Sequence, residues 1–124
     1  MIILIVDDSG VMRRIHKNTL MENGVAEQFL LEAADGQEAL KLSEENQITL
    51  FLVDWNMPRM DGLAFVKKLR ASEKYSSTPI IMVTSEAAKY NVIQAISSGV
   101  TDYVVKPIKG PILWDKISAY LGSG

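Results

Sequence analysis

The stretch that decides the fold is Ile2-Ile3-Leu4-Ile5-Val6-Asp7-Asp8, near the start of the chain. An unbroken aliphatic run without polar alternation is typical of a parallel strand that is buried on both faces. The run is too short to cross a bilayer, and it lacks the basic residues that open a signal peptide. We therefore expect a buried strand with Asp7 and Asp8 at its carboxyl end.

Similar apolar runs recur along the chain and alternate with amphipathic segments. In one such segment Leu63, Val66 and Leu69 recur every third residue, which is the spacing of one helix face. The apolar runs predict strands at residues 2–6, 29–33, 50–53, 80–83 and 103–105. The amphipathic segments predict helices that begin near residues 10, 36, 62, 87 and 111.

A strand, a crossover helix and a parallel strand form the βαβ unit, and this unit repeats along the whole chain. The sequence therefore predicts an α/β fold with a doubly wound parallel sheet. We expect residues 1–121 to form one domain, residues 122–124 to form a flexible tail, and no output domain to be attached.

Composition excludes several classes of function. The 124 residues include no cysteine, which excludes disulfides, thiolate nucleophiles and cysteine metal sites. His16 is the single histidine, and because it lies among Arg14, Lys17 and Asn18 we expect it on a solvated helix surface. The basic residues Arg13, Arg14 and Lys17 are expected to form a solvated face as well. The formal net charge of −2 argues against nucleic-acid binding. The lack of an export signal or membrane span predicts a cytoplasmic protein with no membrane partner.

Polar residues follow the predicted strands at their carboxyl ends. Asp7 and Asp8 follow the first strand, Asp54 the third, Thr84 the fourth and Lys106 the fifth. In open α/β sheets the ligand site lies beyond these strand ends, so we expect these side chains to meet at one edge.

Three carboxylates at one edge repel one another unless a cation neutralises them. No soft ligand is present, so a hard cation is implied, and Mg²⁺ binds carboxylates while keeping waters and accepting a phosphate oxygen. Lys106 and Thr84 would supply a charge and a hydrogen bond to the remaining phosphate oxygens. An aspartate in the centre of such a group, here Asp54, can accept a phosphoryl group on its carboxylate.

The chain resembles the response-regulator receiver domains over nearly its whole length. The residues that carry the resemblance are Asp7-Asp8, Asp54, Thr84, Lys106-Pro107 and the loop Met57-Pro58-Arg59-Met60-Asp61-Gly62. The strings around Asp54, Thr84 and Lys106, with Met12-Arg13-Arg14-Ile15, are most similar to the single-domain chemotaxis regulators of the CheY type. The resemblance implies a flavodoxin-like (βα)5 fold with five strands in the order 2-1-3-4-5.

The resemblance also implies roles for single residues. Asp54 would take a phosphoryl group from a phosphohistidine on a sensor histidine kinase. Asp8 and Asp54 would bind Mg²⁺ directly, Asp7 through water, and the backbone carbonyl of Asn56 would complete the site. Lys106 would contact the phosphoryl group, and its peptide bond to Pro107 would be cis.

Switching and output are implied in the same way. Thr84 would move toward the phosphoryl group and Tyr103 would follow it, while Asn56 and Glu86 would tune hydrolysis toward a short-lived phosphoryl-Asp54. A partner would bind the surface formed by the fourth helix, fifth strand and fifth helix. The candidate partner-face residues are Lys89, Tyr90, Val92, Ile96, Tyr103, Val105 and Lys116.

The implied output partner is a flagellar motor switch protein, with a phosphatase as a possible further partner and a monomer as the working form. Ile108, Tyr90 and Trp114 depart from the usual chemotaxis pattern on or near this face. The alternative output is a phosphate sink or a relay intermediate. The protein would be a signalling switch that catalyses only its own phosphorylation and dephosphorylation.

Three other functions fit the residues less well. An FMN-binding electron-transfer protein needs a phosphate loop after the first strand, where Asp7 and Asp8 would repel the phosphate. A phosphatase with an aspartyl nucleophile usually carries it after the first strand with a second acid two residues later, whereas Asn56 stands two residues after Asp54. A pseudo-receiver scaffold would have lost the acceptor and metal residues.

Overall fold

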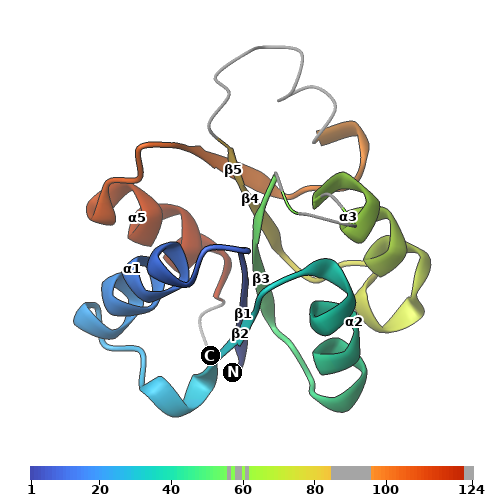
Figure 1. Cartoon of the computed structure of the whole chain (residues 1–124), viewed down its shortest axis with the longest axis horizontal. Coiled ribbons are helices and arrows are strands. Elements are labelled where there is room, and N and C mark those ends of the chain that lie inside the picture. The colour runs from blue at the N-terminus through green and yellow to red at the C-terminus, as the bar shows by residue number, and fades with distance from the viewer. Residues whose placement is uncertain (56, 58–59, 61, 85–95, 122–124) are drawn as a thin grey trace.

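The structure is a computed structural model that describes residues 1–55, 57, 60, 62–84 and 96–121. Five parallel strands form one sheet in the order β2-β1-β3-β4-β5 (Figure 1). The strands are β1 (Ile3–Val6), β2 (Leu30–Ala33), β3 (Leu50–Asp54), β4 (Ile80–Thr84) and β5 (Asp102–Val105). The predicted fold class and strand order are confirmed.

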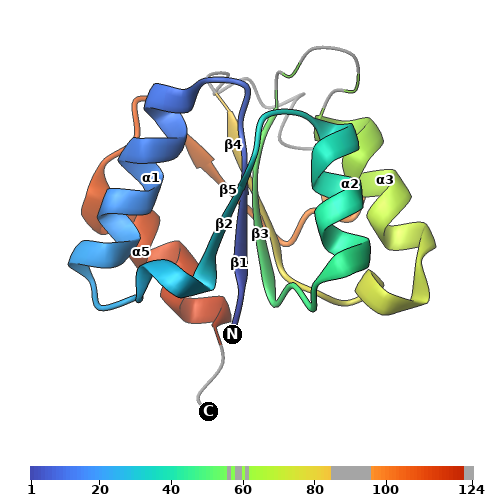
Figure 2. The ribbon, with the colours of Figure 1, turned by 60° about the horizontal axis from the view of Figure 1, so that its bottom comes forward.

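Helices cover both faces of this sheet, as Figure 2 shows. One layer contains α1 (Gly10–Glu22) and α5 (Gly110–Tyr120), and the other contains α2 (Gly36–Glu45) and α3 (Gly62–Ala71). Two 3₁₀ turns, Glu27–Phe29 and Glu73–Tyr75, precede β2 and β4. Most of the helix predicted to begin near residue 87 lies outside the described residues. None of the described helices is long and apolar enough to cross a membrane.

Side-chain caps begin the two helices that follow β1 and β2. Ser9 precedes α1, and its hydroxyl oxygen accepts a hydrogen bond from the Met12 N–H at 3.2 Å. Asp35 precedes α2 and accepts one from the Glu38 N–H at 2.8 Å. These bonds satisfy N–H groups that the first helical turn leaves without an intrahelical partner. Each cap therefore ends the loop that leads from a strand end into a helix.

Successive side chains of a strand point to opposite faces of the sheet, so the core is divided into one cluster on each face. Leu4, Val6, Phe51 and Val53 belong to the cluster with Phe65, Val66 and Leu69 of α3. Ile3, Ile5, Leu50 and Leu52 belong to the cluster with Leu20 of α1 and with Leu113 and Ile117 of α5. Because both faces are covered, the central strands consist of apolar residues without polar alternation.

Candidate functional site

The carboxylates of Asp7, Asp8 and Asp54 gather at the carboxyl end of the sheet. Each offers one oxygen, and these three oxygens all lie within 4.8 Å of one another. Asp7 and Asp54 are 1% and 4% exposed, whereas Asp8 is exposed. The predicted acidic cluster is therefore present, with two members in the protein interior and one at the surface.

Strand pairing brings these residues together. Val6 of β1 pairs with Val53 of β3, so the residues that follow them, Asp7 and Asp54, lie at the same level of the sheet. The Asp7 N–H donates to the Ala33 carbonyl at 3.1 Å, and its Oδ1 accepts from the Ser9 N–H at 2.9 Å. These bonds hold the Asp7 backbone and one carboxylate oxygen in place.

The environment of Asp7 suits a bound cation. Its Oδ2 is buried and has no hydrogen-bond partner among the residues that the structure describes. Burial raises the pKa of Asp7 to about 6, and the nearby Asp54 carboxylate acts in the same direction. A buried carboxylate oxygen without a partner among the described residues, beside two further carboxylates, is a donor set that a hard cation such as Mg²⁺ can bind.

Lys106 supplies the positive charge of the site. Its Nζ lies 3.2 Å from Asp54 Oδ1, and its backbone N–H donates to the Thr84 carbonyl at 2.7 Å. The peptide bond between Lys106 and Pro107 is cis, as predicted. The end of β5 is thus joined to the end of β4 while the lysine side chain reaches the end of β3.

Thr84 also lies at the carboxyl end of the sheet. It is the last residue of β4 and is buried, and its neighbour Val83 pairs with Asp54 on β3. Thr84 therefore stands one residue beyond the level of Asp54 on the adjacent strand. The structure thus places all five predicted strand-end residues at one edge of the sheet.

Arg13 contributes to the site in a way that the sequence interpretation missed. Its Nη1 donates to the Asp7 carbonyl at 2.6 Å, and its Nε donates to Glu32 Oε1 of β2 at 3.1 Å. Arg13 is therefore not simply part of a solvated basic face. The sequence contained one indication of this contact, because Arg13 lies one to two helical turns after Asp7 and Asp8, on the helix that they precede.

The prediction for His16 was wrong. His16 is 1% exposed, and neither ring nitrogen has a hydrogen-bond partner among the described residues. Burial lowers the pKa of His16 to about 4, and the positive charge of Lys106 acts in the same direction. The flanking residues Arg14 and Ile15 are exposed, so the histidine occupies the buried side of α1.

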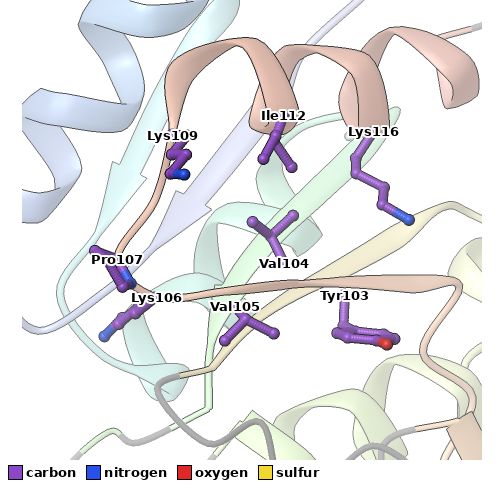
Figure 3. Close-up of a pocket in the computed structure, with 8 residues that line it drawn as sticks. All are labelled: Tyr103, Val104, Val105, Lys106, Pro107, Lys109, Ile112 and Lys116. Carbon is purple, nitrogen blue, oxygen red and sulfur yellow. The ribbon is translucent and has the colours of Figure 1, made fainter.

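Part of the predicted partner face lines a pocket beside β5 and α5 (Figure 3). The pocket has a volume of about 500 Å³, and its lining includes Tyr103, Val105 and Lys116. Ile96 is not among the lining residues and is 57% exposed. Lys89, Tyr90 and Val92 lie outside the described residues, as do Asn56 and Glu86.

The strand order, the acidic cluster at the strand ends and the lysine beside Asp54 define a doubly wound α/β domain with a candidate cation site at one edge of its sheet. The chain matches the response regulator receiver domain over residues 3–118, and it belongs to that family. The resemblance stated from the sequence is confirmed.

Curated relatives cover nearly the whole chain. A chemotaxis protein CheY homolog of Campylobacter jejuni is 48% identical over 123 residues, which are 98% of this chain and 93% of that protein. Chemotaxis protein CheY1 of Helicobacter pylori strain J99 is 46% identical over 122 residues, 98% of this chain and 97% of that one. The protein is thus a receiver domain of the CheY type.

A solved structure agrees with this assignment. The chemotaxis response regulator CheY4 of Vibrio cholerae matches with a TM-score of 0.87 and 33% sequence identity, covering 95% of this chain and 96% of that chain. The protein is therefore a response regulator of two-component signalling, and the two relatives above are named as chemotaxis proteins. Family membership supports a phospho-acceptor switch as its general function.

Proposed function

We propose that Asp54 accepts a phosphoryl group from a phosphohistidine of a sensor histidine kinase and that the protein then signals to a chemotaxis partner. The observation that carries this proposal is the contact between Lys106 Nζ and Asp54 Oδ1 at 3.2 Å, beside two further aspartates. Lys106 supplies positive charge beside the Asp54 carboxylate, and the two aspartates would hold a cation that supplies more of it to an incoming phosphoryl group.

The phosphoryl transfer needs no reactant other than the kinase phosphohistidine and Asp54. An Asp54 carboxylate oxygen attacks phosphorus, the phosphorus–nitrogen bond to the kinase histidine breaks, and an acyl phosphate forms. Hydrolysis by water then returns the carboxylate and releases phosphate. Lys106 neutralises charge on the phosphoryl oxygens, and the buried Thr84 hydroxyl donates a hydrogen bond to one of them.

Mg²⁺ is the proposed cofactor. Asp8 and Asp54 would hold it through carboxylate oxygens, Asp7 through a water, and the backbone carbonyl of Asn56 would be a further ligand. When bound, Mg²⁺ offsets the charge of the aspartates and of the entering phosphoryl group. The buried Asp7 Oδ2, which has no hydrogen-bond partner in the part of the chain that the structure describes, supports this assignment.

Switching would pass from the site to the surface through Thr84 and Tyr103. Phosphorylation adds negative charge at Asp54, and Thr84 would move toward it, which leaves space that the Tyr103 ring would enter. The phosphoryl group must stabilise this arrangement more than the original one, because only a difference in affinity shifts a population. Asn56 and Glu86 would tune hydrolysis and give a short phosphoryl lifetime.

The proposed output partner is a flagellar motor switch protein in the cytoplasm, bound by the surface that includes Tyr103, Val105 and Lys116. A phosphatase would shorten the signal. We propose that residues 1–121 act as one domain and as a monomer. The second candidate output is a phosphate sink or relay, favoured by Ile108 and Trp114, which depart from the chemotaxis pattern and pack against the core cluster that includes Leu113 and Ile117.

A peptide-binding experiment separates these outputs. A peptide from the amino terminus of a flagellar motor switch protein is titrated into the protein with Mg²⁺, with and without beryllofluoride as a phosphoryl mimic. We expect tighter binding with beryllofluoride. No binding, or binding that ignores beryllofluoride, would contradict the motor output and favour a sink or relay. The matched control is Asp54→Asn, in which beryllofluoride should have no effect.

A further inference from the structure

Asp102, the first residue of β5, joins this strand to α5. Lys116 Nζ lies 3.1 Å from Asp102 Oδ1 and 3.2 Å from Oδ2, and the Tyr120 hydroxyl donates to Oδ2 at 3.1 Å. Hydrogen bonding to Asp102 raises the pKa of this hydroxyl. The same carboxylate also accepts a hydrogen bond from the Tyr103 backbone N–H at 2.8 Å. One carboxylate therefore binds two side chains of α5 and the backbone of β5.

This carboxylate holds Lys116 near the ring of Tyr103. Lys116 Nζ lies 6.0 Å from the ring centroid, which is the limit of the range for a cation–π contact. Figure 3 shows the Lys116 side chain extending from α5 toward Tyr103, with both residues lining the pocket. The partly buried Tyr103 ring thus has a positive charge beside it, and Asp102 fixes the position of that charge.

We propose that Asp102 is a positioning residue that holds Lys116 over the Tyr103 ring and so stabilises the unphosphorylated arrangement of the switch. This inference rests on the proposed function, in which the Tyr103 ring moves toward Thr84 after phosphorylation. That movement would take the ring away from the Lys116 ammonium. The contact therefore opposes the movement, and removing it should make activation easier.

The expected effect is small because the pair is partly solvated. The side chains of Lys116 and Asp102 are 41% and 19% exposed, and ion pairs of this kind contribute little. Loss of the pair should therefore lower the beryllofluoride concentration needed for half-activation by about two- to fivefold.

The experiment is a ¹⁹F NMR titration of protein labelled with 3-fluorotyrosine. Tyr103→Phe assigns the Tyr103 resonance, and beryllofluoride is added at constant Mg²⁺. Compared with wild type, Asp102→Asn should show a lower midpoint and a Tyr103 resonance shifted toward its activated position before any beryllofluoride is added. Asn keeps the side-chain size and an oxygen that can accept the Tyr103 N–H.

Three further variants test whether the effect acts through Lys116. Lys116→Gln should lower the midpoint to the same extent, and the double variant with Asp102→Asn should lower it no further. Asp102→Glu retains the charge and should move the midpoint back toward wild type. If Asp102→Asn does not fold, Lys116→Gln provides the same test.

The matched control is Asp115→Asn. Asp115 is exposed, is adjacent to Lys116 in the sequence, and has no carboxylate contact within the described part of the chain. This substitution makes the same charge change and should leave the midpoint unaltered. Equal midpoints for wild type and Asp102→Asn, or an equal shift in Asp115→Asn, would overturn the inference. A wild-type protein that does not respond to beryllofluoride would instead contradict the proposed function, and the inference with it.

Discussion

Lys106 Nζ lies 3.2 Å from Asp54 Oδ1, although 52 residues separate the two in the sequence. The lysine follows β5 and the aspartate ends β3, and β4 lies between these strands. The lysine side chain must therefore reach past the end of β4, where its own N–H is bound to the Thr84 carbonyl. Three strand ends are joined by this one residue.

Mg²⁺ should stabilise the folded protein because the three clustered carboxylates repel one another without it. At about one hundred times its dissociation constant, Mg²⁺ should raise the free energy of unfolding by about 2.7 kcal/mol. Asp8→Asn should reduce this gain, whereas Glu45→Gln, an exposed carboxylate at the end of α2, should leave it unchanged. Urea unfolding with and without Mg²⁺ measures the effect. Equal gains for wild type and Asp8→Asn would contradict the assignment.

Arg13→Ala should weaken Mg²⁺ binding because Arg13 donates to the Asp7 carbonyl at 2.6 Å. Substitution of a residue that orients a metal ligand commonly lowers the metal affinity by about tenfold or more, so we expect about a tenfold loss of Mg²⁺ affinity. The fluorescence of Trp55, next to Asp54, can follow the titration. Arg14→Ala is the control, since Arg14 is exposed and forms no hydrogen bond or ion pair with the described residues. Removal of a positive charge alone should strengthen the binding of a cation, so a similar loss in both variants would contradict a specific role for the Arg13–Asp7 contact.

His16→Leu should remove part of the pH dependence of stability. The pKa of His16 is about 4 in the folded protein and 6.5 for an unperturbed histidine, so between these values the unfolded chain binds a proton that the folded protein does not. The His16 contribution therefore falls as the pH is lowered from about 6.5 to about 4, by about 3 kcal/mol. Removal of two buried nitrogens that have no hydrogen-bond partner among the described residues should also raise the stability at pH 7 by about 1 kcal/mol or more.

The measurement is the difference in unfolding free energy between His16→Leu and wild type across this pH range. The Asp7 contribution to stability changes with pH in the opposite direction, because the raised pKa of Asp7 makes the folded protein bind a proton more readily than the unfolded chain does. Since both proteins contain Asp7, this contribution cancels in the difference. The advantage of His16→Leu should grow as the pH falls. A constant difference would show that His16 is not held neutral by burial.

Gly62→Ala should displace the backbone beside the acceptor. A Cβ at Gly62 would lie 2.6 Å from the Asp54 carbonyl oxygen and 3.1 Å from Trp55 Cα, so backbone must shift to accept it. We expect a loss of about 1–3 kcal/mol in stability together with slower phosphorylation. Gly110→Ala is the control, because the nearest atom to its Cβ would be 3.7 Å away, at Thr19. Similar losses for both variants in thermal unfolding would contradict the steric explanation.

The sequence predicted the fold and the strand-end residues because both follow from local patterns. Apolar runs without alternation require a sheet covered on both faces, and parallel strands bring their carboxyl ends to one edge. Asp7, Asp54 and Thr84 were found in this way, and the cis bond before Pro107 came from the family resemblance.

Contacts between distant side chains could not be predicted in this way. His16 was assigned to the surface because its sequence neighbours are basic, but only the packing of α1 on the sheet decides which side it faces. The contact of Arg13 with Asp7 and the contact of Asp102 with Lys116 depend on how a helix lies against a strand. The spacing of Arg13 from Asp7 indicates that the two residues lie near each other, but spacing alone does not contain the packing geometry that forms these contacts.

The site of phosphorylation tests the central claim most directly. The protein is treated with phosphoramidate as a small phosphodonor, with and without Mg²⁺, and intact mass and peptide mapping after borohydride reduction locate the modified residue. We predict one phosphoryl group, formed only with Mg²⁺ and located on Asp54, and none in Asp54→Asn. A phosphoryl group on another residue of the wild-type protein, or equal phosphorylation of Asp54→Asn, would contradict the account.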